Sequence, residues 1–320
     1  MVAFMAIVCK HQKIGQISMW NLIIRNKMHQ SGTLRLKKMT LLSFFFLQIS
    51  FNVFGQQTIL WSVKDTGNHK TTYLLGTYHQ IGNSFVDSIP DIEVKLNSSE
   101  LAIFESVDNE NLIIDIINAR KENKKTMKFI SNDDFFQLKE LSKSWKVDIN
   151  KLSTAEIVLK LQQSLPVIIC GTVKETDKFS HFDNYLIYKA NQKNIPVYGL
   201  ESDTIQIQII NQKFDSKYNK KEKEHILYLS KILAEKDKSK YSCEFVEKYK
   251  KFDLHYELSK ECNDDILLKQ RNDKWLPIIV EKAKKYNCFI AVGFLHLYNN
   301  CGLITQLRNN GFVVEPVSLK

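Results

Sequence analysis

The sequence predicts an α/β protein with a central mixed sheet flanked by helices and with a largely helical insertion. Apolar runs of strand length alternate with helical stretches, and one strand pattern occurs twice, at Thr72–His79 and at Phe289–His296. In each copy the run stops at a glycine and a histidine follows three residues later. No low-complexity linker interrupts residues 56–320, so we expect a single domain there, and the 44% hydrophobic content of the whole chain allows a sizeable core.

The basic charge of the chain is concentrated in its first 55 residues. Seven of the 45 Lys and Arg residues lie there with no Asp or Glu, which leaves 38 basic and 35 acidic residues and a net charge of about +3 in the body. This distribution argues against a nucleic-acid partner.

The same stretch is typical of an export signal. Lys37-Lys38 precedes a short apolar region, and residues 39–55 have the layout of a signal peptide with cleavage before Gln56. We therefore expect a periplasmic or secreted protein, with contact to a membrane only if the signal stays uncleaved as an anchor. Residues 1–38 fit poorly before such a signal, and Met39 or Met28 is an alternative start.

The first predicted elements follow the order strand, strand, helix, strand. A turn-rich stretch joins Ile59–Val63 to Thr72–Tyr78, as in a hairpin. Pro90 fits the first turn of a helix, and Leu101–Glu105 reads as a buried strand that ends in a carboxylate. This order is typical of a parallel strand pair with a helical crossover.

Residues 109–165 show helical periodicity. Ser131 and the residues after it form an N-cap region for Phe135–Trp145, and Ser153-Thr-Ala-Glu156 resembles a capping box. We expect these helices to cover the sheet or to roof a cleft.

The second half of the chain repeats the alternation. We expect a helix from His181 to about Gln192, a short strand at Pro196–Glu201 that again ends in a carboxylate, and solvated helical faces within the Lys- and Glu-rich Lys213–Lys260. The remaining predicted elements are a helix at Asp264–Lys285 that Pro277 interrupts or kinks, a strand at Cys288–Val292, a helix at Leu303–Arg308 and a strand at Phe312–Val317.

Four polar residues lie at predicted strand ends: His79, Glu105, Glu201 and His296. Imidazole and carboxylate donors suit a divalent metal, and a carboxylate outside the metal shell can act as general base. Arg271 and Asn272 could stabilise an oxyanion or hold substrate. The alternatives stay open: the histidines could be structural, and both glutamates could pair with Arg271. No zincin, nucleophile-elbow or nucleotide-binding motif occurs.

Other polar residues are weaker candidates. His181 precedes a helix and could be only a cap-region residue, and the histidines in charged stretches are expected to be solvated. Five cysteines follow the leader, an odd count that leaves at least one thiol, and their spacing assigns no pairing, although proximity of Cys288 and Cys301 is plausible.

These motifs together resemble the TraB/PrgY/GumN family, to which the Tiki-like metalloproteases are related. The resemblance spans about Thr58 to Val317 and rests on the following segments: Trp61-Ser-Val, Tyr73–His79, Phe104-Glu105, Phe182-Asp-Asn-Tyr-Leu186, Pro196–Glu201, Arg271-Asn272-x-x-Trp275 and Ala291–His296. Bacterial relatives often continue the second motif as His-Leu-x-Gly, whereas here Gly302 comes later, after Cys301.

The resemblance implies a fold like that of erythromycin esterases and ChaN-like haem-binding proteins. It also implies a metal-dependent, peptidase-like hydrolase that uses manganese or cobalt, with zinc or iron as other options. By motif, the metal ligands would be His79, His296, Glu105 and Glu201, and the catalytic residues Glu105, Glu201, Arg271 and Asn272. The partner would be a peptide or protein substrate. The rival interpretation is a binding protein for haem, a metal or a signalling peptide, with Tyr78 or Tyr298 beside the ligand; a small-molecule esterase is a third.

Overall fold

The computed structural model describes residues 58–67, 70–108, 110–130, 132–214, 218 and 220–319. The expected leader at residues 1–55 lies outside this part of the chain. Among the described residues, no helix is both long and apolar enough to cross a lipid bilayer.

A six-stranded mixed sheet forms the centre of the molecule, which confirms the predicted fold class. Its strands are β1 (Leu60–Asp65), β2 (Thr71–Thr77), β3 (Leu101–Phe104), β4 (Val197–Gly199), β5 (Cys288–Gly293) and β6 (Phe312–Pro316), in the order β4-β3-β5-β2-β1-β6. The first two strands pair as the expected antiparallel hairpin, and β6 pairs with β1, also antiparallel. The strands β2, β5, β3 and β4 run parallel, so their carboxyl ends share one edge.

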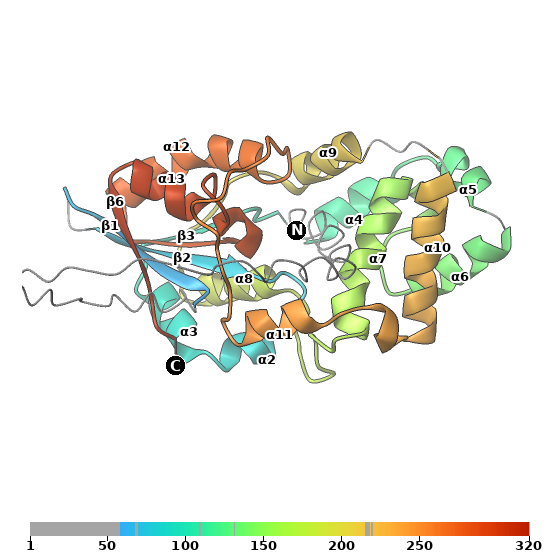
Figure 1. The fold of residues 1–320 in the computed structure, drawn as a ribbon, viewed down its shortest axis with the longest axis horizontal. Coiled ribbons are helices and arrows are strands. Elements are labelled where there is room, and N and C mark those ends of the chain that lie inside the picture. Colours follow the sequence, from blue (N-terminus) through green and yellow to red (C-terminus); the bar gives the residue numbers. More distant parts are fainter. Residues whose placement is uncertain are drawn as a thin grey trace, which may run out of the picture.

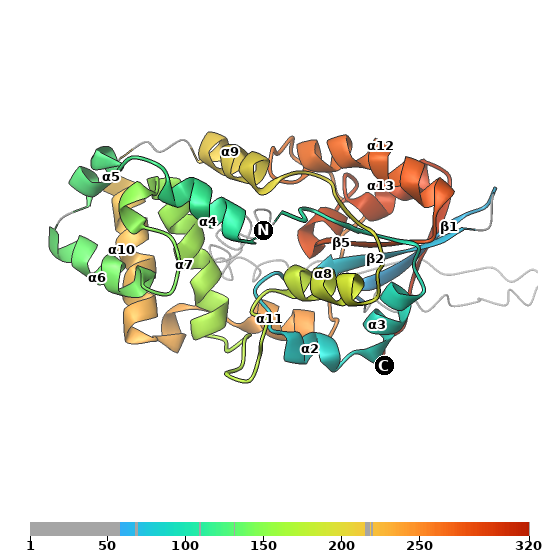
Figure 2. The ribbon, with the colours of Figure 1, turned by 180° about the vertical axis from the view of Figure 1, so that it is seen from behind.

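Helices cover both faces of this sheet. Figures 1 and 2 show α12 (Lys269–Lys285) and α13 (Leu303–Asn309) on one face, and α3 (Pro90–Asn97) and α8 (Phe182–Gln192) on the other, beside the shorter α2 (Asn83–Asp87) and α11 (Glu244–Lys250). Burial on both sides explains why every residue of β5 is buried and apolar or glycine.

A second group of helices lies beyond the carboxyl ends of the strands. It consists of α4 (Glu110–Asn118), α5 (Lys124–Phe129), α6 (Asn132–Ser142), α7 (Thr154–Ile168) and α10 (Lys220–Glu235). These helices bury a core of their own, which includes Leu138, Leu161 and Ile226. The helical insertion therefore packs on itself, and the expected capping box of Ser153 and Glu156 starts its helix α7.

The helix α9 (Asp203–Lys213) was not predicted. Its isoleucines and glutamines alternate with a strand-like period, but Ser202 caps the helix and accepts a hydrogen bond from the backbone N of Ile205. The helix buries Gln206, Ile209 and Ile210, which lie three and four residues apart on one face. Tertiary packing has overridden the local pattern here.

Two other expectations about α12 need correction. The helix begins at Lys269 rather than at Asp264, and it continues across Pro277 without starting a new segment. Proline removes one backbone hydrogen bond. Burial of Trp275, Ile279 and Ala283 on the same helix holds that face in the core and compensates for the loss.

The cysteines form two disulfides, Cys170–Cys243 and Cys262–Cys301, and Cys288 is the free, buried thiol among the described residues. The structure therefore pairs Cys301 with Cys262, which lies in a segment, residues 251–268, that carries neither helix nor strand.

Candidate functional site

The candidate site is built at the shared carboxyl edge of the parallel strands. Thr77 at the end of β2 pairs with Gly293 at the end of β5, and Phe104 at the end of β3 pairs with Gly199 of β4. Each strand stops at the same level, so the polar residues that follow in sequence are brought together. The short 3₁₀ helix η4 (Phe294–Leu297) then carries His296 into the same place.

His79 is held from one side by a carboxylate. Its Nδ1 lies 2.6 Å from Oδ2 of Asp183, whose other oxygen accepts from the hydroxyl of Thr77 at 2.8 Å. Because the pKa of Asp183 is lowered to about 2 by His79, against the opposing effect of burial, the carboxylate is ionised and can only accept. The proton of a neutral His79 ring therefore lies on Nδ1, and its Nε2 carries a lone pair.

That lone pair is buried and lacks a hydrogen-bond partner among the described residues. Nε2 of His79 faces Oε1 of Glu105 at 3.7 Å, and Nε2 of His296 lies 3.6 Å from the same oxygen. The two repeated histidines thus approach one carboxylate oxygen, each with the same ring nitrogen.

His296 is held by a neutral amide on one side and by a guanidinium on the other. Its Nδ1 donates to Oδ1 of Asn272 at 2.6 Å, and its Nε2 accepts from Nη1 of Arg271 at 3.1 Å. The ring is fully buried, and burial lowers the pKa of His296 well below its ordinary value, an effect that the cation of Arg271 strengthens. The imidazole is therefore neutral and in the Nδ1–H tautomer.

Arg271 joins the two predicted carboxylates. Its Nη2 donates to Glu105 and to Glu201, each at 2.6 Å, and its Nε donates to Glu201 at 3.3 Å. With Nη1 on Leu267 and His296, all five N–H groups are used. The ion pairing that the sequence left open is present, and removal of Arg271 would leave two buried carboxylates at a cost of about 3–5 kcal/mol.

Glu105 has the most contacts of the carboxylates at this edge. Its Oε1 also accepts from the backbone N of Gly293 at 2.7 Å, and its Oε2 accepts from Gln206 of α9 at 3.3 Å. Burial alone would raise the pKa of Glu105, but the cation of Arg271 helps to hold it below its usual range. The group is ionised and faces both histidines.

The chain matches the sequence model of the TraB/PrgY/gumN family over residues 59–316, which covers the sheet, the insertion and all of these side chains. It belongs to this family. Comparison with curated proteins gives no match, and comparison with solved structures gives none either. The assignment to the TraB/PrgY/gumN family therefore rests on the family match and agrees with the resemblance seen in the sequence.

In this family member, a group that could hold a metal ion consists of His79, His181 and Asp183, whose ligand atoms all lie within 4.8 Å of one another. His181 is the N-cap residue of α8 but makes no side-chain cap hydrogen bond. Instead its ring stacks on that of His79, with ring centroids 5.3 Å apart. Its Nδ1 is 3.6 Å from Asp183, and neither of its ring nitrogens has a hydrogen-bond partner among the described residues.

The residues fit a divalent metal on two further observations. Gly293 leaves open the space in front of His79, since an added Cβ would lie 2.8 Å from Nε2 of His79 and 3.1 Å from Oε1 of Glu105. Burial lowers the pKa of His181 to about 3, so this imidazole too is neutral and able to ligate. Nitrogen and carboxylate donors of this kind suit manganese, cobalt, zinc or iron.

The structure also places the aromatic residues that the binding-protein interpretation used. Tyr78 is buried among aromatic rings and stacks on Phe294, and Tyr298 packs against Tyr256 with ring centroids 4.9 Å apart. Both tyrosines thus belong to the packing behind the site.

Sequence reasoning found six residues that the structure brings together: His79, Glu105, Glu201, Arg271, Asn272 and His296. It missed His181 and Asp183 as members of the site. The signal was present, because Asp183 lies in the segment Phe182-Asp-Asn-Tyr-Leu186, but a helix start explained that segment well enough by itself. Only the backbone bond from Phe182 N to His79 O, at 3.0 Å, puts this helix start beside the first histidine.

Proposed function

We propose that the protein is a metal-dependent hydrolase that cleaves peptide bonds outside the cytoplasm. The observation that carries the proposal is the state of His79: Asp183 fixes its proton on Nδ1, while Nε2 is buried, unpartnered and directed at Glu105. A metal-bound histidine usually donates its other ring N–H to a carboxylate, a backbone carbonyl or water. A purely structural histidine would have both nitrogens satisfied.

The ion would be held by His79, His296 and Glu105, with Asp183 behind the first ring and His181 as the nearest further imidazole. Once bound, a divalent ion would polarise a carbonyl group and make a water molecule more acidic. Glu201 would be the carboxylate that accepts the proton of that water. This role differs from that of Glu105, which lies beside both imidazoles.

Arg271 has a conditional role in this proposal. One of its N–H groups is donated to Nε2 of His296, a nitrogen that cannot accept this proton and ligate an ion at once. If His296 held the ion, this N–H would be free to donate to the oxygen of a substrate carbonyl. Asn272 has no such group to spare, because its amide donates to two backbone carbonyls and its oxygen accepts from His296. We assign it the positioning of that ring.

Exposure suggests the side from which a substrate enters. The side chain of His296 is inaccessible, those of His79 and Glu105 are 2% and 4% exposed, and that of His181 is 15% exposed. The exposed fraction thus rises from the second histidine toward the start of α8. We infer that a peptide reaches the site past His181.

Export is proposed on two grounds. Residues 39–55 have the layout of a signal peptide, and the described chain contains two disulfides, which persist in oxidising compartments. A periplasmic or secreted location agrees with both.

The test is metal analysis of the purified protein together with manganese- or cobalt-dependent cleavage of a peptide library. His79→Ala and His296→Ala should each lose bound metal and cleavage, whereas His255→Ala, whose side chain is 79% exposed, should behave as wild type. Unchanged metal content and cleavage in both site variants would refute the proposal. Metal binding without cleavage of any peptide would favour a binding protein instead.

A further inference from the structure

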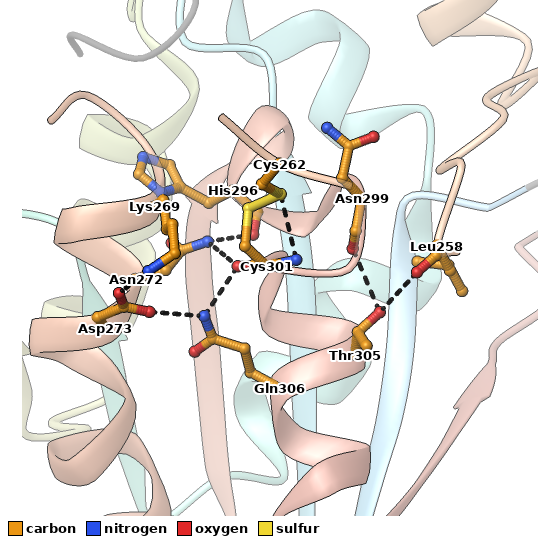
Figure 3. Close-up of a disulfide and its surroundings, with 10 residues drawn as sticks. All are labelled: Leu258, Cys262, Lys269, Asn272, Asp273, His296, Asn299, Cys301, Thr305 and Gln306. Atoms are coloured by element: carbon orange, nitrogen blue, oxygen red, sulfur yellow. Dashed lines mark hydrogen bonds and ion pairs between the residues drawn. A yellow bond between two sulfur atoms is a disulfide. The ribbon is translucent and has the colours of Figure 1, made fainter. Parts of the chain in front are cut away.

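The loop after His296 is fastened to a segment that comes before α12. Residues 251–268 contain neither helix nor strand, and Cys262 within them is bonded to Cys301. Backbone hydrogen bonds accompany the disulfide, from Asn299 N to Tyr256 O at 2.9 Å and from Asn300 N to Lys260 O at 3.0 Å. Figure 3 shows the disulfide Cys262–Cys301 and, beside it, the side chains of Asn272 and His296.

A short series of contacts leads from the disulfide to the imidazole. The backbone N of Cys301 donates to Sγ of Cys262 at 3.2 Å, and the carbonyl of Cys301 accepts from Nδ2 of Asn272 at 2.9 Å. The same Nδ2 donates to the carbonyl of His296 at 3.0 Å, and Oδ1 of Asn272 accepts from the ring at 2.6 Å. Figure 3 shows these contacts from Cys301 to Asn272 and on to His296.

The Asn272 amide acts together with Arg271 on the tautomer of His296, because the amide faces Nδ1 and Arg271 donates to Nε2. With Nδ2 on the two carbonyls, Oδ1 faces the ring and requires the proton on Nδ1, which leaves the lone pair on Nε2. A reversed amide would place N–H against Nδ1 and would move the ring proton to Nε2, where Arg271 already donates. The carbonyl of Cys301 is the acceptor that does not come from the histidine itself, so it fixes the orientation from outside.

A second donor holds the same carbonyl. Nε2 of Gln306, on α13, donates to Cys301 O at 2.9 Å and to Oδ1 of Asp273 at 2.9 Å. The carbonyl is thus placed by the disulfide through its own residue and by Gln306 through a hydrogen bond. Gln306 can be removed without touching either cysteine.

We propose that Cys262–Cys301 is a positioning disulfide for the catalytic centre, which keeps His296 in the tautomer that can ligate. Its effect on the ring follows from the contacts above, and its effect on metal binding rests on the proposed function. The disulfide Cys170–Cys243 offers a matched control. It joins the region after α7 to the N-cap of α11. Its cysteines are half-buried, as are Cys262 and Cys301.

The experiment is ¹⁵N NMR of the full-length, metal-free protein with labelled histidine, with the ring signals of His296 identified by their loss in His296→Ala. Wild type should show a protonated Nδ1 and a bare Nε2. Cys262→Ser/Cys301→Ser should shift His296 toward a tautomer mixture and weaken binding of manganese or cobalt by about 10–100-fold. Cys170→Ser/Cys243→Ser should leave the signals unchanged and the affinity within about twofold.

Unaltered His296 signals in folded Cys262→Ser/Cys301→Ser, or equal changes in both double variants, would overturn the proposal. If that double variant does not fold, Gln306→Leu provides the test, with a smaller shift of His296 in the same direction expected and no shift refuting it. The two hypotheses fail in different ways. A wild type with the fixed tautomer that binds neither ion contradicts the metal function, while the NMR comparison still decides the positioning role.

Discussion

The two repeated strand ends carry the same Gly-x-x-His pattern but hold their histidines differently. Asp183, an ionised carboxylate, accepts from His79, whereas Asn272, a neutral amide, accepts from His296. Nε2 of His79 has no hydrogen-bond partner within the part of the chain that the structure describes, whereas Nε2 of His296 accepts from Arg271. The repeat therefore fixes one tautomer twice, and the surroundings give the first ring the more electron-rich nitrogen. If the proposed metal function holds, His79 would be the ligand that needs no change of partner, and His296 would ligate only without the hydrogen bond from Arg271.

The glycines of the two motifs should respond differently to the same substitution. A Cβ on Gly293 would lie 2.8 Å from Nε2 of His79, in the space that a ligand needs. Gly293→Ala should therefore reduce metal affinity and cleavage by at least about 100-fold, more than the usual loss of an outer-shell partner.

A Cβ on Gly76 would instead meet Cβ and Cα of Phe294 at 2.9 and 3.0 Å, inside the core. Gly76→Ala should cost about 1–3 kcal/mol of folding free energy by overpacking. Denaturant unfolding and metal titration of both variants check the pair. Loss of metal binding in Gly76→Ala with full binding in Gly293→Ala would reverse our assignment.

The residues that accept from the two histidines, Asp183 and Asn272, should respond differently when each is replaced by the other type. Asp183→Asn can still accept from His79, because its amide can donate to the hydroxyl of Thr77 in place of the present bond. The ring then loses its charged partner, and we expect metal affinity to fall by about 10–100-fold with little change in stability.

Asn272→Asp should have the opposite profile. A carboxylate can hold Nδ1 of His296, but it cannot donate to the carbonyls of His296 and Cys301. The carbonyl of His296 loses its donor, whereas that of Cys301 keeps the hydrogen bond from Gln306. The free energy of unfolding should therefore drop by about 1–3 kcal/mol for the one acceptor left without a partner. Calorimetry and metal titration of both variants distinguish the profiles, and equal losses in both would argue against separate roles for the two strand ends.

The pH dependence of stability separates the histidines from Asp183. The folded pKa values of His296 and His181 lie below the ordinary value of 6.5, because burial disfavours the charged rings. Below about pH 6.5 the unfolded chain therefore binds more protons than the folded chain, and the free energy of unfolding decreases as the pH falls. Between pH 6.5 and 5, each histidine should cost the metal-free protein about 2 kcal/mol.

Asp183 affects stability in a lower pH range than the histidines. Its folded pKa of about 2 lies below the ordinary value of 3.8, so its contribution is present above pH 3.8 and is lost as the pH falls toward 2. Urea unfolding at a series of pH values provides the measurement. The variants His181→Gln and His296→Gln should each reduce the slope between pH 6.5 and 5, and a slope that neither variant alters would contradict the assignment.

The strand ends were predictable because their chemistry is local in sequence. An apolar run, a glycine and a histidine lie within eight residues, and parallel strands align their carboxyl ends whatever the order of the sheet. Glu105 and Glu201 could be placed by the same rule. The family resemblance then joined them to Arg271 and Asn272.

The partners of the histidines were not predictable in this way. The contact between Asp183 and His79 depends on how α8 packs under β2, and the contact between Asn272 and Cys301 depends on a disulfide whose pairing the sequence does not give. Likewise α9, which supplies Gln206 to Glu105, has a strand-like alternation that only its tertiary contacts overrule. The residues at the strand ends can be found from local sequence patterns, whereas the side chains that hydrogen-bond them are known only from the tertiary packing.

The smallest effect that we predict concerns the stability of the two disulfides. Cys170–Cys243 closes a separation of 73 residues and Cys262–Cys301 one of 39. In the chain-entropy description each stabilises the fold by about 4 kcal/mol, and the longer loop contributes about 0.6 kcal/mol more. In denaturant unfolding, Cys170→Ser/Cys243→Ser should therefore be less stable than the other double variant by that amount. Its His296 site should nevertheless stay intact. If the variant lacking Cys262–Cys301 proved the less stable by several kcal/mol, this ordering of the two disulfides would be wrong.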